Sequence, residues 1–229
     1  MLPRFYSIAL AFLWTHVAAD AMAAPTFKTH DGYFQVTPIG RLQLDAGYVI
    51  DDSNTTANTN ADIRRLWTGV DAKAGDHWSG RFVLSWENKQ TDIQDFYARY
   101  NTGSNWRFAL GQYREYTDME NSSGNSNTLL MEYATANQVF AGIRRVGLGA
   151  EYYANQNGFQ AGIFTRNLNN NPADDDGYTL ASRAYRFWHN PDEQQRLHLG
   201  IFARYRNQKE PFDRLRWRGR GESRVIENR

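Results

Sequence analysis

Four arginines stand at every second position near the end of the chain. They are Arg214, Arg216, Arg218 and Arg220. In an extended segment, alternate residues project to the same side, so the four guanidinium groups would form a row. Such a row attracts anions and offers planar donor forks to their oxygen atoms, and arginine rings line anion pores. A solvated basic tail, or a segment that binds nucleic acid or lipid headgroups, would have the same pattern.

Other basic residues recur along the chain, mostly opposite its apolar positions. They are Arg41, Arg65, Lys73, Arg81, Arg99, Arg107, Arg166, Arg183, Arg196, Arg204 and Arg206. A polar lumen explains this placement, and so does the wet face of any exposed sheet. A lipid-facing position does not, because a charge there costs about 2–4 kcal/mol near the membrane midplane.

Strands must position these arginines, because the chain alternates in polarity with a period of two. The clearest case is the segment 196–206, where Leu197, Leu199, Ile201, Ala203 and Tyr205 share one face. The same pattern predicts about nine strands. They are expected at 39–50, 63–73, 79–87, 94–101, 106–113, 145–154, 159–166, 179–189 and 196–206.

The connections between these strands are alternately short and long. The short ones are rich in Gly, Asn and Asp, as at Thr102–Asn105 and Asn155–Gly158, which suits tight turns. The long ones are Asp51–Asp62, Arg114–Arg144 and Asn167–Tyr178. Outer-membrane barrels have short periplasmic turns and longer external loops. A soluble β-sandwich, the main alternative, has no reason to gather its long loops at one end.

Composition agrees with a barrel. The mean hydropathy of −0.70 is too low for a helical membrane protein, yet 14% of the residues are aromatic. In a transmembrane barrel only alternate strand residues meet lipid, and aromatic residues gather at both interfaces. The predicted fold is therefore all-β, an antiparallel transmembrane β-barrel. Bacterial single-chain barrels have even strand numbers, so nine strands with a charged tail would be an incomplete barrel.

The start of the chain has the pattern of an export signal. Met1–Arg4 is a short basic start, Phe5–Trp14 is apolar, and Ala21-Met22-Ala23 offers small residues for cleavage. We expect a signal peptide over 1–23 and a barrel domain over 24–229, in the outer membrane of a Gram-negative cell. A buried N-terminal helix is the alternative. No later segment approaches the ~18 apolar residues of a transmembrane helix.

Other chemistry has weak support. Ser79 lies two residues after His77, a spacing that a lipid-cleaving barrel enzyme could use, but no third residue orients the histidine. The histidines lack metal-site spacing, cysteine is absent, and Asp174–Gly177 lacks the closing Glu of a calcium loop. We therefore expect no enzyme activity, cofactor, metal or nucleic-acid partner.

A non-conducting structural barrel is a further alternative. A small closed barrel fills its interior with side chains. Here the inner positions carry seven glycines, which we interpret as room for a wide lumen. They are Gly47, Gly69, Gly111, Gly147, Gly149, Gly162 and Gly200.

Several short motifs resemble the phosphate-selective porins of Gram-negative outer membranes. They are Gly40-Arg41-Leu42-Gln43, Ala61-Asp62-Ile63-Arg64-Arg65, Asp95–Tyr100, Leu110–Tyr113, Gly147–Gly149 and the arginines of 214–218, all within 40–229. The resemblance implies a sixteen-stranded trimeric porin, of which this chain would supply about nine strands. It also implies that the porin passes small anions such as phosphate or pyrophosphate. It also implies an arginine ladder at Arg41, Arg64, Arg65, Arg214, Arg216 and Arg218, which Arg220 extends.

The third connection on the external side, Arg114–Arg144, departs from that family. Family members carry lysine at the constriction, but Arg114–Gln138 has none and has a net charge of −3. If this loop folds into the lumen, we expect it to repel phosphate. Anion transport therefore remains the prediction, but selectivity for phosphate does not follow.

Overall fold

The computed structural model describes residues 24–49, 58–87, 90–123, 133–134, 137, 143–169, 177–189 and 196–207. The predicted signal peptide lies outside these residues. So does the arginine row from Arg214 to Arg220. Both remain predictions from sequence.

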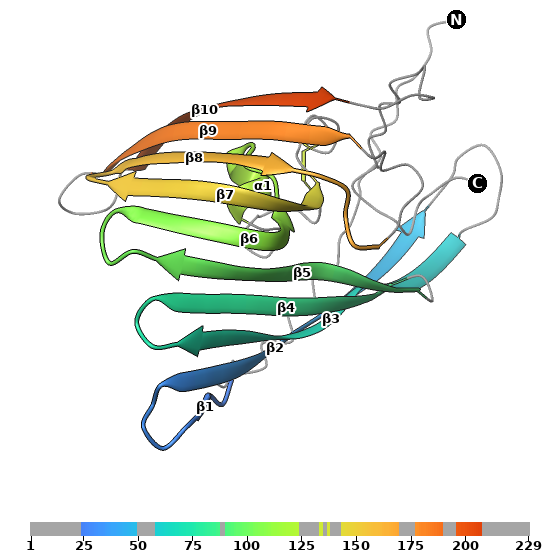
Figure 1. Ribbon diagram of the computed structural model, residues 1–229. Helices are drawn as coiled ribbons and strands as arrows, with labels where there is room; N and C mark the ends of the chain where they lie inside the picture. The colour runs from blue at the N-terminus through green and yellow to red at the C-terminus, as the bar shows by residue number, and fades with distance from the viewer. Residues whose placement is uncertain are drawn as a thin grey trace, which may run out of the picture.

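The described residues form one antiparallel sheet of ten strands, in which each strand pairs with its neighbours in sequence (Figure 1). The strands are β1 (Phe27–Lys28), β2 (Phe34–Val49), β3 (Asn58–Ala74), β4 (Trp78–Glu87), β5 (Gln90–Asn101), β6 (Trp106–Arg114), β7 (Arg144–Ala154), β8 (Asn157–Phe164), β9 (Tyr178–His189) and β10 (Arg196–Asn207). The predicted all-β fold is confirmed, and the nine predicted strands correspond to β2–β10. The two-residue strand β1 was not predicted.

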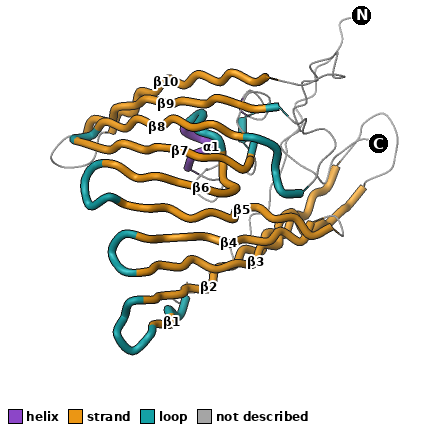
Figure 2. Tube along the Cα trace, in the orientation of Figure 1, coloured by secondary structure: helices purple, strands orange, loops and turns teal. Residues whose placement is uncertain are grey.

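Tight turns join the strands at one end of the sheet, as the short connections predict (Figure 2). Gly75 and Gly103 have φ angles of 58° and 78° in the turns after β3 and β5. Between β7 and β8, Asn155 and Gln156 both have positive φ, and Ala154 pairs with Asn157. This is the two-residue hairpin geometry that matches the twist of antiparallel strands.

The two faces of the sheet differ in chemistry. One face exposes large apolar side chains that no part of the described chain covers, including Leu44, Leu110, Leu148, Leu199 and Ile201. The other face carries most of the arginines and the only described helix, α1 (Met119–Ser123). An apolar outer face and a charged inner face are typical of a barrel wall in a membrane. None of the described helices is long and apolar enough to cross a membrane.

Aromatic side chains gather near both ends of the outer face. Near the tight turns, Trp78 lies 4.9 Å from Tyr100 between ring centroids, and Trp188 is exposed on β9. At the opposite end, the rings of Tyr178 and Tyr205 lie 6.3 Å apart. Tyr178 and Trp188 are ten residues apart on β9, which is about 33 Å along a strand and about 25 Å across a membrane at a tilt of ~40°. This matches the apolar band of a transmembrane barrel.

A β-bulge interrupts the alternation in β3. Gln43 pairs with Arg65 and Leu44 pairs with Ile63, so Arg64 is the extra residue of the bulge. An extra residue in one strand shifts the side-chain alternation by one. Ile63 is exposed, whereas both consecutive arginines, Arg64 and Arg65, are buried.

Candidate functional site

The described start of the third external connection, residues 115–123, folds back onto the inner face of the sheet. Its Tyr116 packs with Tyr113 and Phe164 against small residues of the sheet. A Cβ atom added at Gly149 would lie 2.4 Å from the hydroxyls of both Tyr113 and Tyr116. This corrects the interpretation of the inner glycines as open space, because at Gly149 the room is filled by tyrosine side chains of the same chain.

A buried carboxylate ties this loop to the sheet. Glu115, the first residue after β6, forms ion pairs with Arg145 of β7 (3.1 Å) and Arg204 of β10 (2.8 Å). Burial raises the pKa of the Glu115 carboxyl, while the charges of Arg204 and Arg145 act to lower it. Two arginines therefore offset one of the acidic charges that were expected to make the loop repel anions.

The end of α1 is tied to the sheet as well. Nη1 of Arg183 on β9 donates to Oγ of Ser122 (2.7 Å). Arg114 donates to the backbone carbonyl of Asn121 (2.7 Å). The loop is therefore held against the inner face at two points, at Glu115 ahead of α1 and at the end of α1.

A cavity of about 590 Å³ lies between the loop and the inner face of the sheet. Its wall contains seven arginines and three carboxylates, so positive charge is in excess. The arginines are Arg41, Arg81, Arg99, Arg107, Arg114, Arg144 and Arg183, and the carboxylates are Asp95, Glu115 and Glu151.

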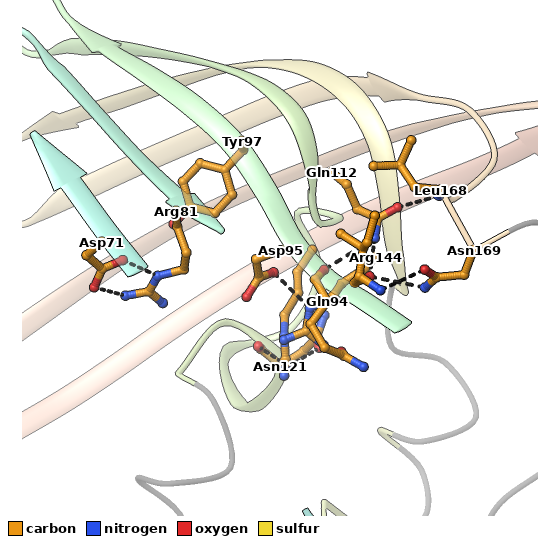
Figure 3. A network of polar contacts seen from close by, with 12 residues as sticks. Asp71, Arg81, Gln94, Asp95, Tyr97, Gln112, Asn121, Arg144, Leu168 and Asn169 are labelled. Carbon is orange, nitrogen blue, oxygen red and sulfur yellow. Dashed lines mark hydrogen bonds and ion pairs between the residues drawn. The ribbon is translucent and has the colours of Figure 1, made fainter. Parts of the chain in front are cut away.

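Two of these arginines are held by aspartates (Figure 3). Arg81 donates two hydrogen bonds to Asp71, at 2.6 and 2.8 Å. Arg144 donates to Asp95 at 2.8 Å. Each aspartate offsets the charge of its partner, so these arginines contribute less to the attraction of an anion.

Three other arginines lie over tyrosine rings. The guanidinium carbons of Arg99, Arg107 and Arg183 lie 4.6, 4.2 and 4.7 Å from the ring centroids of Tyr97, Tyr153 and Tyr185. A ring face holds a guanidinium group without neutralising its charge. Among the described residues, no carboxylate lies within ion-pair distance of Arg183.

The buried carboxylate of Glu151 stands between the other two ring-supported arginines. Its Oε1 lies 3.5 Å from Arg99 and its Oε2 lies 3.5 Å from Arg107. The hydroxyls of Tyr116 and Tyr153 donate to the same two oxygens, at 3.0 and 3.1 Å. Each carboxylate oxygen therefore has one guanidinium and one phenol partner.

The start of the connection Asn167–Tyr178 is fixed to the bulge in β5 through Leu168 and Asn169. Val83 pairs with Asp95 and Leu84 pairs with Ile93, which leaves Gln94 as the extra residue. Asn169 accepts from the Ile93 backbone nitrogen (2.8 Å) and donates to its carbonyl (3.1 Å). Figure 3 also shows Gln112 bridging this point to Leu168. Polar side chains thus satisfy the backbone groups that the bulge frees.

The structure brings together only part of the predicted ladder. Arg41 lines the cavity and lies over the ring of Trp67, 5.4 Å from its centroid. Arg65 donates to Gln43 (2.7 Å), and Arg64 is buried beside it at the bulge. The other predicted positions, Arg214, Arg216, Arg218 and Arg220, lie outside the described residues.

Several residues of the site were not predicted from the sequence. They are Arg114, Arg144, Arg145, Glu115 and Glu151. The alternation of β7 gave a weak signal for Glu151, because it shares a face with Gly147 and Gly149 and pairs with Arg107. For the loop residue Glu115 no local pattern existed, since its partners lie on β7 and β10.

The other chemical candidates gain no support from the geometry. His77 Nδ1 lies 2.7 Å from the carbonyl of Asn101, and among the described residues no hydrogen bond joins His77 to Ser79. Within the same residues, no group of three metal-ligating side chains occurs. The sequence 174–176 lies outside the described residues.

Comparison with known proteins identifies the family to which the chain belongs. The family model of phosphate-selective porin O and P matches residues 36–229 of the chain. The chain belongs to this porin family. Family membership and the antiparallel fold point to the outer membrane of a Gram-negative cell.

A relative of this porin is an uncharacterized protein of Caulobacter vibrioides. The two sequences are 26% identical over an alignment of 203 residues, which covers 83% of this chain and 40% of the relative. The porin chain thus spans 40% of the length of the curated relative that it matches.

Proposed function

We propose that this chain forms part of an outer-membrane porin through which small anions, such as phosphate or pyrophosphate, diffuse passively. The observation that carries the proposal is the inner cavity, whose wall has seven arginines against three carboxylates. The tyrosine rings under Arg99, Arg107 and Arg183 support these side chains while their positive charge is kept. A cleft lined by charge of one sign concentrates ions of the opposite sign.

The arginine ladder would extend this attraction along the pore. Arg41, Arg64 and Arg65 belong to β2 and β3, and Arg214, Arg216, Arg218 and Arg220 would add a row from the following segment. Guanidinium groups bind phosphate oxygens in a planar, two-pronged geometry. In this chain guanidinium groups, rather than lysines of the third loop, would hold the anion.

Family resemblance supports the rest of the assembly. The proposal includes export by a signal peptide over residues 1–23, contact of the apolar outer face with membrane lipid, and a homotrimer of barrels with about sixteen strands each. It includes no cofactor and no enzymatic step.

A non-conducting structural barrel is the second candidate. The observation in its favour is that Tyr113 and Tyr116 fill the space beside Gly149, which narrows the lumen. A measurement of single-channel conductance separates the anion channel from the non-conducting barrel.

The test is single-channel recording in a planar bilayer, with the mature product purified from outer membranes and a salt gradient across the bilayer. Discrete steps with a reversal potential on the anion side are expected. Arg216→Glu and Arg218→Glu should each move that potential toward the cation side. A folded, membrane-extracted protein that gives no steps would overturn the channel and favour the non-conducting barrel.

A further inference from the structure

Glu151 is a buried side chain whose negative charge runs against the positive excess of the cavity. It is only 2% exposed and lines the cavity wall. In an anion pathway, a carboxylate at this depth would repel the solute unless it has another role. Its four partners indicate which role that is.

The partners of Glu151 form a complete coordination shell for an oxyanion. Two guanidinium groups, from Arg99 and Arg107, and two phenol hydroxyls, from Tyr116 and Tyr153, surround its two oxygens. Cationic donors and hydroxyls are the groups that bind a carboxylate or phosphate. The carboxylate of Glu151 therefore occupies an anion site that the chain builds from its own side chains.

The two arginines are placed so that they can exchange partners. Each lies 3.5 Å from Glu151, longer than a strong charge-assisted hydrogen bond of about 2.8 Å. Each guanidinium group also lies over a tyrosine ring, Arg99 over Tyr97 and Arg107 over Tyr153. The contact with the ring can hold each guanidinium group in place while its N–H groups donate to another anion in place of Glu151.

We infer that Glu151 is an internal counter-ion that competes with a passing oxyanion for Arg99 and Arg107, and thereby sets how tightly the pore holds its solute. This inference rests on the proposed function as an anion pore. Conduction requires a site that attracts the ion strongly enough to admit it and weakly enough to release it. Glu151 weakens an arginine site that would otherwise retain a phosphate.

The test is Glu151→Gln, which keeps the shape and removes the charge. Inorganic phosphate is titrated against the chloride current of single channels, and the concentration that halves the current is measured. We expect this concentration to fall about tenfold or more, as for the gain of one hydrogen bond between charged groups. Phosphate blocks should also last longer in Glu151→Gln than in the wild type.

Two matched variants separate this role from a general charge effect. Asp31→Asn makes the same charge change in the exposed turn between β1 and β2 and should leave the phosphate titration unchanged. The double variant Glu151→Gln with Arg107→Gln removes one charge of each sign and should return the titration close to that of the wild type. If Glu151→Gln does not fold, Glu151→Asp keeps the charge on a shorter side chain and should give a smaller shift in the same direction.

The outcomes distinguish this inference from the proposed function. A wild-type protein that conducts no anions would overturn both. Anion conduction with the same phosphate titration in Glu151→Gln as in the wild type would overturn the role of Glu151 alone. An equal shift in Asp31→Asn would also overturn it, because the effect would then be one of net charge.

Discussion

The carboxylate of Glu115 forms a 2.8 Å ion pair with Arg204, although the two residues belong to the third loop and to β10. Between β6 and β10 lie three further strands of the sheet. The contact therefore fastens the loop across the inner face, well beyond the hairpin from which it begins. The position of the loop, and with it the shape of the cavity, depends on this pair and on Arg145.

Removal of this carboxylate should release the loop. Glu115→Gln would leave Arg145 and Arg204 without their carboxylate partner, and loss of one member of a buried ion pair costs about 3 kcal/mol. We expect a lower midpoint of denaturant unfolding in detergent and a larger, noisier single-channel current. Glu120→Gln is the matched control, because the described partners of the Glu120 carboxylate, Ala134 and Asn137, belong to the loop itself. Equal unfolding midpoints for the two variants would contradict the role given to Glu115.

The packing of Tyr116 of the loop against Gly149 of β7 can be tested by a substitution in the sheet. Gly149→Ala places a Cβ atom 2.4 Å from the hydroxyls of Tyr113 and Tyr116, and such overpacking costs about 1–3 kcal/mol. Gly40→Ala is the control, since its nearest neighbour would be 3.6 Å away. Thermal unfolding should show a lower Tm for Gly149→Ala only. A loss of stability in Gly40→Ala of the same size would point to a general effect of replacing strand glycines.

The strands were predictable because alternation is a local property of the sequence. Each side chain in β10, for example, follows the period of two from Arg196 to Asn207, and nothing distant alters it. The same rule failed at Arg64 and Arg65, because strict alternation places consecutive residues on opposite faces. The bulge opposite Gln43 and Leu44 changes this, and bulges leave little trace in one sequence.

The site was less predictable, because its contacts join residues that are distant in the chain. In the sequence, Glu115 is one of the acidic residues of a loop with net negative charge, and only the fold shows that Arg204 lies beside it. Glu151 lies opposite Arg107 only in the register of β6 and β7. The arginine excess itself followed from the alternation, whereas the division into aspartate-held and ring-supported arginines depended on side-chain positions that no spacing reveals.

Arg183 should contribute more to anion selectivity than arginines held by aspartates. It lies over Tyr185 and, among the described residues, has no carboxylate within ion-pair distance. We expect Arg183→Gln to raise the phosphate concentration that halves the chloride current about tenfold, which corresponds to about 1.4 kcal/mol. Arg186→Gln on the same strand is the control, because Arg186 pairs with Leu199 and lies over the ring of Trp188 at the outer face. Similar titrations for both variants would mean that the position of the charge is irrelevant.

The assignment of the outer face to lipid can be tested with two neighbouring residues of β10. Ile201 is 74% exposed on the apolar face, and Phe202, the next residue, pairs with Arg183 of the inner face. An arginine at a lipid-facing position near the membrane midplane costs about 2–4 kcal/mol, whereas the lumen is wet and tolerates charge. Ile201→Arg should therefore lower the free energy of unfolding from lipid vesicles by about that amount, with a much smaller loss for Phe202→Arg. A greater loss of stability in Phe202→Arg than in Ile201→Arg would mean that Phe202, and not Ile201, faces the lipid.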